Sequence, residues 1–80
     1  MVTPESIKSS IEDGLGCDVV TVTGDGHHFE ALVVSSAFRG LSRIARHRLV
    51  YAAMGERMRE EVHALSMTTL SPEEHAAQDR

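Results

Sequence analysis

The chain has 80 residues and a formal net charge of −4, and only three of its side chains, two Phe and one Tyr, are aromatic. The negative charge and the scarcity of aromatics argue against a protein that coats nucleic acid by charge or stacks bases on an aromatic platform. Hydrophobic residues make up 41%, which favours a folded core in one small domain, so we expect a single domain over residues 1–80.

The first third of the chain predicts a helix and the start of a β-hairpin. Thr3 can cap a helix that begins at Pro4, and Ile7 and Ile11 repeat at helical spacing. We therefore predict a helix over residues 4–14, stopped by the glycines that follow.

Two strands and a tight turn come next. Residues 18–23 are rich in β-branched side chains, which favour a strand, and residues 24–26 read Gly-Asp-Gly, a hairpin turn signal. A second strand over residues 28–35 is apolar on both faces, which is typical of a central strand. The turn makes these two strands antiparallel.

The second half of the chain returns to helical spacing. We expect a short helix, a turn and a longer helix over about residues 42–60, with Ser42 as a cap. Residues 63–70 alternate as a third strand, and Ser71 opens a capping box before a short C-terminal helix.

The resulting order, α-β-β-α-α-β, predicts a compact α+β domain with a three-stranded sheet and helices on one face. The pairing of the third strand is left open, because spacing alone does not determine it.

The cysteine count and the hydropathy pattern bear on the cellular compartment in which we expect the protein. Cys17 is the only cysteine, so no internal disulfide can form, which fits a reducing environment. No signal-peptide pattern is present, and no apolar run approaches the roughly 20 residues of a membrane span. We expect a soluble cytoplasmic protein with no membrane partner.

The sequence contains no catalytic motif, so we expect no enzymatic activity. Cys17 precedes Asp18, whose negative charge disfavours a thiolate, and we interpret this cysteine as structural. His27 and His28 open the second predicted strand and His63 opens the third, so neighbouring strands would bring them together. These imidazoles are too few for tight metal binding by the isolated chain, but a site completed by a partner stays open.

A basic segment lies between residues 39 and 48, where four of the eight Lys and Arg residues occur without an acid. It is either a solvated helix face or a partner-binding patch. We expect Arg46 and Arg48 to be exposed, because Leu49, Val50 and Met54 define the buried stripe of the helix. The alternative is that one of the two arginines caps or braces the fold. The candidate binding residues for nucleic acid or a partner are Arg39, Arg43, Arg46, His47 and Arg48.

Several runs in this chain, in order and spacing, resemble the BolA family, and the short turn at residues 24–26 resembles its compact IbaG-type bacterial branch. The runs Arg46-His47-Arg48-Leu49-Val50-Tyr51 and Val62-His63-Ala64-Leu65 are the most specific. The others are Gly26-His27-His28-Phe29, Val33-Val34-Ser35, Phe38-Arg39-Gly40 and Leu70-Ser71-Pro72-Glu73.

This resemblance implies a fold similar to class II KH domains and a non-enzymatic role in iron–sulfur cluster trafficking and in iron and redox homeostasis. It implies a monothiol glutaredoxin as partner, with a [2Fe–2S] cluster held between the two proteins and a glutathione thiol among the ligands. His63 matches the family's cluster histidine. The isolated chain would carry no cluster and would be a monomer or a weak homodimer.

The chain departs from the family pattern in the loop between the first two strands. Many members carry a second ligand in a longer loop there, and residues 24–26 offer no aligned counterpart. His28 or His27 could take that place, although neither is inherited from the pattern. His75 also stands where a Trp is usual, which puts the packing of the last helix in doubt.

The resemblance leaves a second function open, since some BolA proteins are described as DNA-binding transcription regulators in stress response and cell shape. The basic segment would then contact phosphates, with a helix–turn–helix presenting Arg46 and Arg48. The negative net charge and the lack of a Gly-x-x-Gly loop argue against it.

Overall fold

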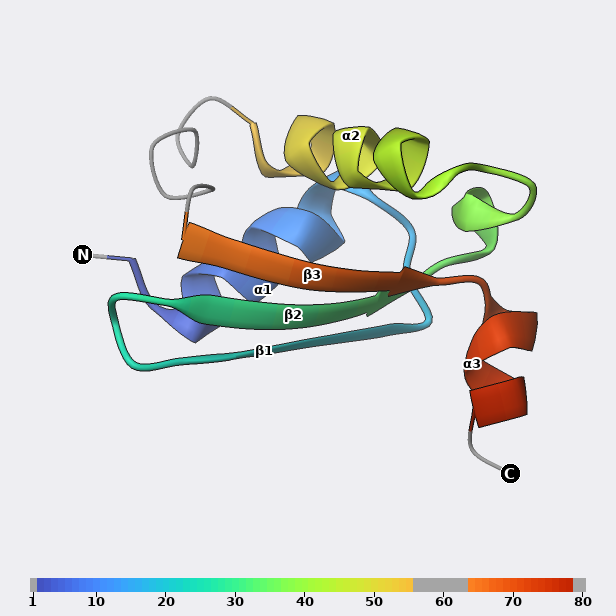
Figure 1. The fold of residues 1–80 in the computed structure, drawn as a ribbon. Coiled ribbons are helices and arrows are strands. Elements are labelled where there is room, and N and C mark those ends of the chain that lie inside the picture. Colours follow the sequence, from blue (N-terminus) through green and yellow to red (C-terminus); the bar gives the residue numbers. More distant parts are fainter. Residues whose placement is uncertain (1, 56–63, 79–80) are drawn as a thin grey trace.

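The structure is a computed structural model that describes residues 2–55 and 64–78. Within these residues, α1 and α2 lie on one face of a sheet of three strands, and α3 follows at the end of the last strand (Figure 1). The α+β prediction is confirmed, with a mixed sheet. The elements are α1 (Pro4–Gly14), β1 (Val19–Gly24), β2 (Phe29–Val34), η1 (Ser36–Phe38), α2 (Arg43–Met54), β3 (Leu65–Leu70) and α3 (Pro72–Gln78).

The strands lie in the order β1-β2-β3, so the doubly apolar β2 is the central strand, as its sequence predicts. β1 and β2 form the antiparallel hairpin. β3 pairs with β2 in the parallel direction, with Phe29 beside Leu65 and Val34 beside Leu70. β2 and β3 therefore begin at the same end of the sheet, which the sequence had left open.

α1 begins and ends where its sequence predicts. The Thr3 hydroxyl accepts a hydrogen bond from the Ser6 backbone N–H at 3.1 Å, and the Ser6 hydroxyl accepts one from the Thr3 N–H at 3.0 Å. This reciprocal cap satisfies donors that a helix start otherwise leaves without partners. Ile7 and Ile11, four residues apart, are fully buried against the sheet and α2.

The helical region after β2 differs from its prediction. A short helix, η1, lies at residues 36–38, before the predicted region. Residues 43–54 form one uninterrupted helix, so the turn predicted between two helices is wrong for these residues. Ser42 caps α2 by accepting the Ala45 N–H at 3.2 Å, as predicted. Gly55, with φ of +75°, follows its last turn, in a conformation that favours glycine. Residues 56–60 of the predicted helix lie outside the described residues.

The core lies between the sheet and the two helices above it (Figure 1). Phe38 of η1 is fully buried and closes one end of this layer. No helix among the described residues has the length and apolar character needed to cross a membrane. The core residues are Ile7, Ile11, Val20, Phe29, Ala31, Val33, Phe38, Val50, Met54 and Leu65.

α1 and α2 approach each other backbone to backbone at Gly14. A Cβ atom at this position would lie 2.5 Å from the carbonyl oxygen of Ala53 and 2.6 Å from the Cα of Ala53. Cβ atoms in proteins essentially never approach nonbonded atoms this closely. The absence of a side chain at Gly14 thus sets the distance between the two helices.

Gly14→Ala should lower stability even though alanine is the better helix former by roughly 1 kcal/mol. Overpacking against rigid backbone costs about 1–3 kcal/mol, so we expect a melting temperature lower by at least about 4 °C. Gly16→Ala is the matched control, because nothing lies within 4 Å of its Cβ position. Thermal unfolding followed by circular dichroism measures both, and a Gly14→Ala protein that melts higher than the parent would contradict the close approach.

Candidate functional site

His27 and His28 lie in the turn between β1 and β2, at the end of the sheet where β2 and β3 begin, which we name the histidine end. The Asp25 carboxylate oxygen Oδ1 accepts the backbone N–H groups of both histidines at 2.9 Å. Gly26, with φ of +94°, supplies the left-handed conformation that completes the turn. The backbone of the turn is thereby fixed, and both histidine residues are exposed.

The same two hydrogen bonds lower the pKa of Asp25, with the N–H of His28 the larger cause and that of His27 the next. Donors that bind the charged form of a carboxyl favour its ionisation. Asp25 is therefore an anion engaged with the backbone of the turn.

The sequence predicts that His27, His28 and His63 lie together if the second and third strands are neighbours. β2 and β3 are neighbours. Phe29 lies beside Leu65, so β2 and β3 begin at the same end of the sheet. His63 itself lies outside the described residues. Its place beside His27 and His28 stays a prediction.

The described donors at the histidine end do not form a complete metal site by themselves. Imidazole nitrogen is a ligand for iron in clusters in which histidine replaces cysteine. Within residues 2–55 and 64–78, no three His, Cys, Asp or Glu side chains gather as metal ligands. Two adjacent exposed imidazoles therefore leave an iron under-coordinated unless other ligands join them.

Cys17 packs against the hydrophobic core, in keeping with its interpretation as structural. Its thiol donates to the Leu15 carbonyl oxygen at 3.3 Å. Burial raises the pKa of the Cys17 thiol, and the negative charges of Glu12 and Asp18 raise it further. A raised pKa leaves little thiolate, which is the nucleophilic and metal-binding form.

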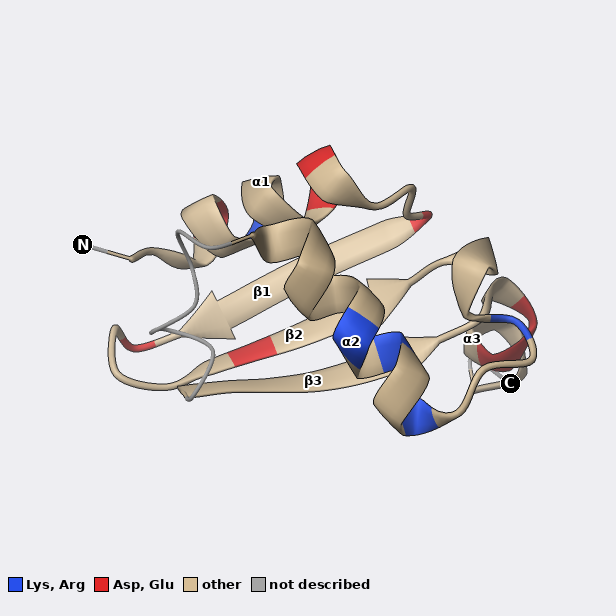
Figure 2. Cartoon of the chain, turned by 90° about the horizontal axis from the view of Figure 1, so that it is seen from above, with Lys and Arg blue, Asp and Glu red and all other residues tan. Residues whose placement is uncertain are grey.

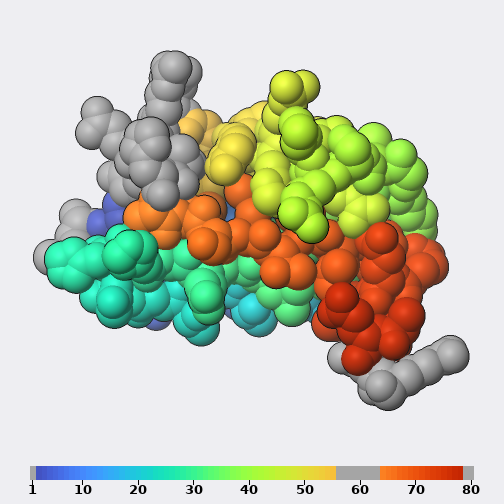
Figure 3. All heavy atoms as spheres, viewed as in Figure 1, coloured from blue at the N-terminus to red at the C-terminus, as the bar shows by residue number. Residues whose placement is uncertain are grey.

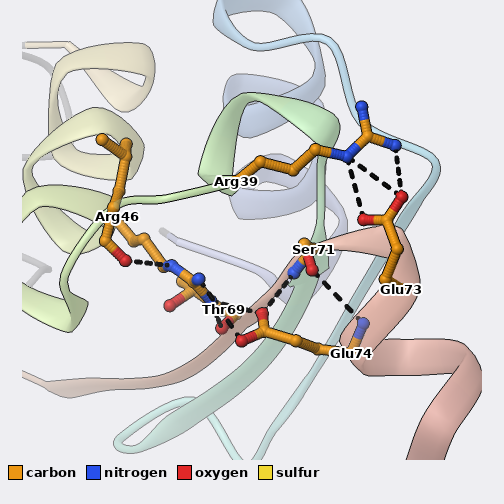
Figure 4. A network of polar contacts seen from close by, with 7 residues as sticks. Arg39, Arg46, Thr69, Ser71, Glu73 and Glu74 are labelled. Carbon is orange, nitrogen blue, oxygen red and sulfur yellow. Dashed lines mark hydrogen bonds and ion pairs between the residues drawn. The ribbon is translucent and has the colours of Figure 1, made fainter.

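The basic segment divides into residues that serve the fold and residues that face solvent. Arg46 belongs to the fold: its Nε donates to the Leu41 carbonyl at 3.0 Å and its Nη1 to the Thr69 carbonyl at 3.0 Å (Figure 4). Nη1 also forms an ion pair with Glu74 at 2.6 Å. The guanidinium carbon lies 5.9 Å from the centre of the Phe38 ring.

The expectation that Arg46 is exposed is wrong, since its side chain is only 12% accessible. The helical stripe identifies which face of α2 packs on the sheet, but Arg46 is long enough to reach past that face to the edge of β3. Arg48 is exposed, as expected.

Glu74 connects Arg46 to the start of α3. Its Oε1 accepts the Ser71 backbone N–H at 2.8 Å, and its own N–H donates to the Ser71 hydroxyl at 3.2 Å. This confirms the predicted capping box. No local pattern indicates that the same carboxylate pairs with Arg46, because the two residues are 28 positions apart.

Arg39 also has an acidic partner. Its Nη2 lies 2.7 Å from Glu73 Oε2, and its Nε donates to both carboxylate oxygens of Glu73 (Figure 4). Both side chains are more than half exposed, so the pair contributes little stability by itself. It does neutralise one of the candidate phosphate-binding cations.

The other three candidate binding residues form no ion pair in the described part of the chain. They are Arg43, His47 and Arg48. Arg43 and Arg48 are exposed, and His47 is half-buried. Figure 2 shows the basic positions gathered on α2 and the loop before it, with acidic positions on α1 and α3. The five-residue patch of the sequence is therefore reduced to three side chains.

Comparison with known proteins identifies relatives over most of the chain. A family model described as BolA-like protein matches residues 2–74. "BolA-like protein 1" from Homo sapiens is 38% identical over 77 residues, covering 84% of this chain and 56% of the relative, so the chain spans about half the length of that protein. "Acid stress protein IbaG" from Escherichia coli K12 is 34% identical over 71 residues, covering 88% of this chain and 84% of the relative.

A third relative, "DNA-binding transcriptional regulator BolA" from Haemophilus influenzae, is 32% identical over 56 residues, covering 70% of this chain and 54% of the relative. Among solved structures, a bolA protein homologue from Coxiella burnetii is 48% identical with a TM-score of 0.83, covering 95% of this chain and 99% of that one.

Two further solved relatives are yeast Fra2 and a domain of a larger plant protein. Fra2 is 32% identical with a TM-score of 0.74, covering 94% of this chain and 85% of that one. The BolA domain of SufE1 from Arabidopsis thaliana is 32% identical with a TM-score of 0.71, covering 89% of this chain and 93% of that one.

Arg46→Ala should destabilise the protein, whereas Arg48→Ala should not. Removing Arg46 leaves the Thr69 and Leu41 carbonyls without a charged donor, which costs about 2 kcal/mol and about 8–16 °C in melting temperature. Arg48→Ala, an exposed change on the same helix, should stay within about 0.5 kcal/mol. Arg46→Lys should recover little, since an ammonium cannot replace the guanidinium fork. Equal melting temperatures for the two alanine variants would show that Arg46 is not structural.

The pair of the largely buried Arg46 with Glu74 predicts loss of stability in acid. Hydrogen bonds from Arg46 and from the Ser71 N–H lower the pKa of Glu74 from 4.5 to about 2, and Arg39 does the same for Glu73. Between these values the unfolded chain binds more protons than the folded one, so stability is present above about pH 4.5 and is lost toward pH 2.

Melting temperatures measured across this interval test the assignment. The parent protein should lose more stability on acidification than Glu74→Gln, which lacks the titrating group and starts from a lower melting temperature at neutral pH. Parallel curves for the two proteins would show that Glu74 has an ordinary pKa.

Proposed function

Because the chain belongs to the BolA family, we propose that it is a non-enzymatic protein that partners a monothiol glutaredoxin through a shared [2Fe–2S] cluster. The role would lie in iron–sulfur cluster trafficking and in iron and redox homeostasis. The thiols of the glutaredoxin and of glutathione would supply the soft ligands that iron–sulfur clusters prefer. His63, which falls inside the matched residues 2–74, would be this chain's ligand.

The parallel pairing of β2 with β3 is the observation that supports this proposal most directly. It brings the start of β3, two positions after His63 in sequence, to the same end of the sheet as His27 and His28. A cluster shared between two proteins needs ligands at an exposed end of the domain, and both of these histidines are exposed.

Asp25 would position the histidine end without taking part in ligation. It holds the backbone N–H groups of His27 and His28, which fixes the turn and leaves the imidazole nitrogens to bind. Ligands on a fixed backbone lose less conformational freedom on binding, which favours association.

The names of the solved relatives are in keeping with partnering. SufE1 contains a BolA domain as part of a larger protein, so this module occurs covalently joined to other protein. The described residues of this chain bring together no metal site of their own, and a partner that completes the coordination supplies what two histidines lack.

DNA binding is the second candidate function. The Haemophilus influenzae relative bears the name of a DNA-binding transcriptional regulator, and Arg43, His47 and Arg48 are free of ion pairs among the described residues. The net charge of −4 and the pairing of Arg39 and Arg46 with acids leave few phosphate-binding cations. The shared cluster is therefore the preferred proposal.

His63→Ala should leave the fold intact but alter or abolish the cluster-bridged complex. The free energy of the bound cluster contributes to association, so losing a ligand should matter far more than losing an exposed contact. The complex with a monothiol glutaredoxin and glutathione is assembled without oxygen and isolated by size exclusion. Visible absorption and circular dichroism of the eluate then report the cluster. An unchanged complex with an unchanged spectrum would refute the assignment of His63.

Matched variants separate the two functions. His47→Ala changes a histidine of α2 and should leave the cluster spectrum unchanged, whereas changing His27 and His28 together should perturb it. DNA binding through phosphates should weaken by roughly 10³-fold between 50 and 200 mM salt if six phosphates are contacted. The cluster-bridged complex should depend on the cluster rather than on salt.

A further inference from the structure

A groove runs along the outer edge of β3, between α2 and α3, and we name it the edge groove. Arg43 and His47 of α2 line one side, Met67 and Thr69 of β3 form the floor, and Gln78 of α3 lies at the end. Figure 3 shows the atoms of β3 (orange) uncovered between those of α2 (yellow-green) above and α3 (red) at the right. The edge groove lies toward the end of β3, away from the histidine end where this strand begins (Figure 1).

The backbone of β3 presents hydrogen-bonding groups to this groove. In a parallel pair, alternate residues direct both backbone groups toward the neighbouring strand. The Ser35 N–H donates to the Leu70 carbonyl at 3.0 Å, so Leu70 and, two residues earlier, Thr68 face β2. Met67 and Thr69 therefore face outward, on the side where β3 has no neighbouring strand.

Arg46 occupies one of the outward backbone groups of β3, at the end of its uncovered edge. Its Nη1 already donates to the Thr69 carbonyl, which agrees with the outward direction of that residue. The outward groups beyond this bond are the N–H of Thr69 and both backbone groups of Met67. Thr69 is 8% accessible and Met67 is half-buried, but both residues line the edge groove. A strand edge that no neighbouring strand covers is a template for an added strand.

The charge along the edge groove favours an acidic occupant. Arg46 is neutralised by Glu74, whereas Arg43 and His47 have no acidic partner among the described residues. The α2 side of the edge groove therefore carries the positive charge of Arg43, with His47 beside it as a further polar group. Carboxylates complement this side, and charge complementarity selects partners and speeds their encounter.

The backbone pattern favours a peptide over a nucleic acid. Met67 offers a donor and an acceptor side by side, and another peptide backbone matches both. A phosphodiester backbone carries acceptors but no matching N–H donors. The net charge of −4 also repels a polyanion over the whole molecule.

We propose that the edge groove binds an acidic, extended segment of a partner protein, which adds to β3 as a further strand. Its backbone bonds to Met67 and to the Thr69 N–H, and its carboxylates lie against Arg43 and His47. This binding does not depend on the proposed cluster, since its residues are separate from His27, His28 and His63.

The test uses two short, end-blocked, fluorescein-labelled peptides, one alternating threonine with glutamate and the other alternating threonine with lysine. Fluorescence anisotropy of the complete protein should show binding of the glutamate peptide and not of the lysine peptide. In ¹⁵N-labelled protein, the backbone amide signals of Met67 and Thr69 should shift on adding the glutamate peptide.

Two variants with the same change of charge locate the site. Arg43→Glu should weaken the glutamate peptide by about tenfold or more, because the new carboxylate repels it inside the edge groove. Arg48→Glu, on an exposed position of α2 outside the edge groove, should weaken it by less than about threefold in physiological salt. Met67→Pro removes an outward N–H without removing a bond to β2, and should also weaken binding.

Three results would overturn the proposal. The first is no binding of the glutamate peptide, and the second is an equal loss in Arg43→Glu and Arg48→Glu, which would indicate attraction to α2 in general. The third is displacement of the peptide by single-stranded oligothymidylate, which would make nucleic acid the occupant. If circular dichroism shows that Met67→Pro is unfolded, the two arginine variants and the amide shifts still test whether the glutamate peptide binds in the edge groove.

Discussion

The guanidinium of Arg46 holds together the half of the molecule where α2, β3 and α3 meet. It donates to the Leu41 carbonyl before α2 and to the Thr69 carbonyl on β3, and pairs with Glu74 on α3. A charge that is 12% exposed is tolerable only with such partners, because burial without them is costly. One side chain thus satisfies a strand edge and a helix start at the same time.

The two ends of the sheet consequently differ in character. At the histidine end, Asp25 fixes a turn and leaves two imidazoles exposed. At the other end, Arg46 ends the free edge of β3 beside the positive side of α2. The proposed cluster belongs to the first end. The edge groove offers a second, independent surface, so one partner at each end could be bound without competition for the same residues.

Charge counted along the sequence overstates the basic surface. The basic segment suggested five candidates for binding phosphate or a partner, yet Arg39 and Arg46 pair with Glu73 and Glu74. These acids are more than 25 positions away in sequence, at distances of 34 and 28 residues. Opposite charges far apart in the chain lie together only in the folded chain, where α3 follows the end of β3. What remains for a partner is Arg43, His47 and Arg48.

The sequence by itself determined the elements whose causes are local: the cap at Thr3, the turn around Gly26 and the capping box at Ser71. Each depends on residues within about four positions, so its signal is present in any short window. Only the tertiary structure decided that β3 runs parallel to β2 and that Arg46 is buried. Both depend on contacts between residues more than 20 positions apart, whose free energy comes from packing the sheet and helices together, a property of the whole chain that no local pattern encodes.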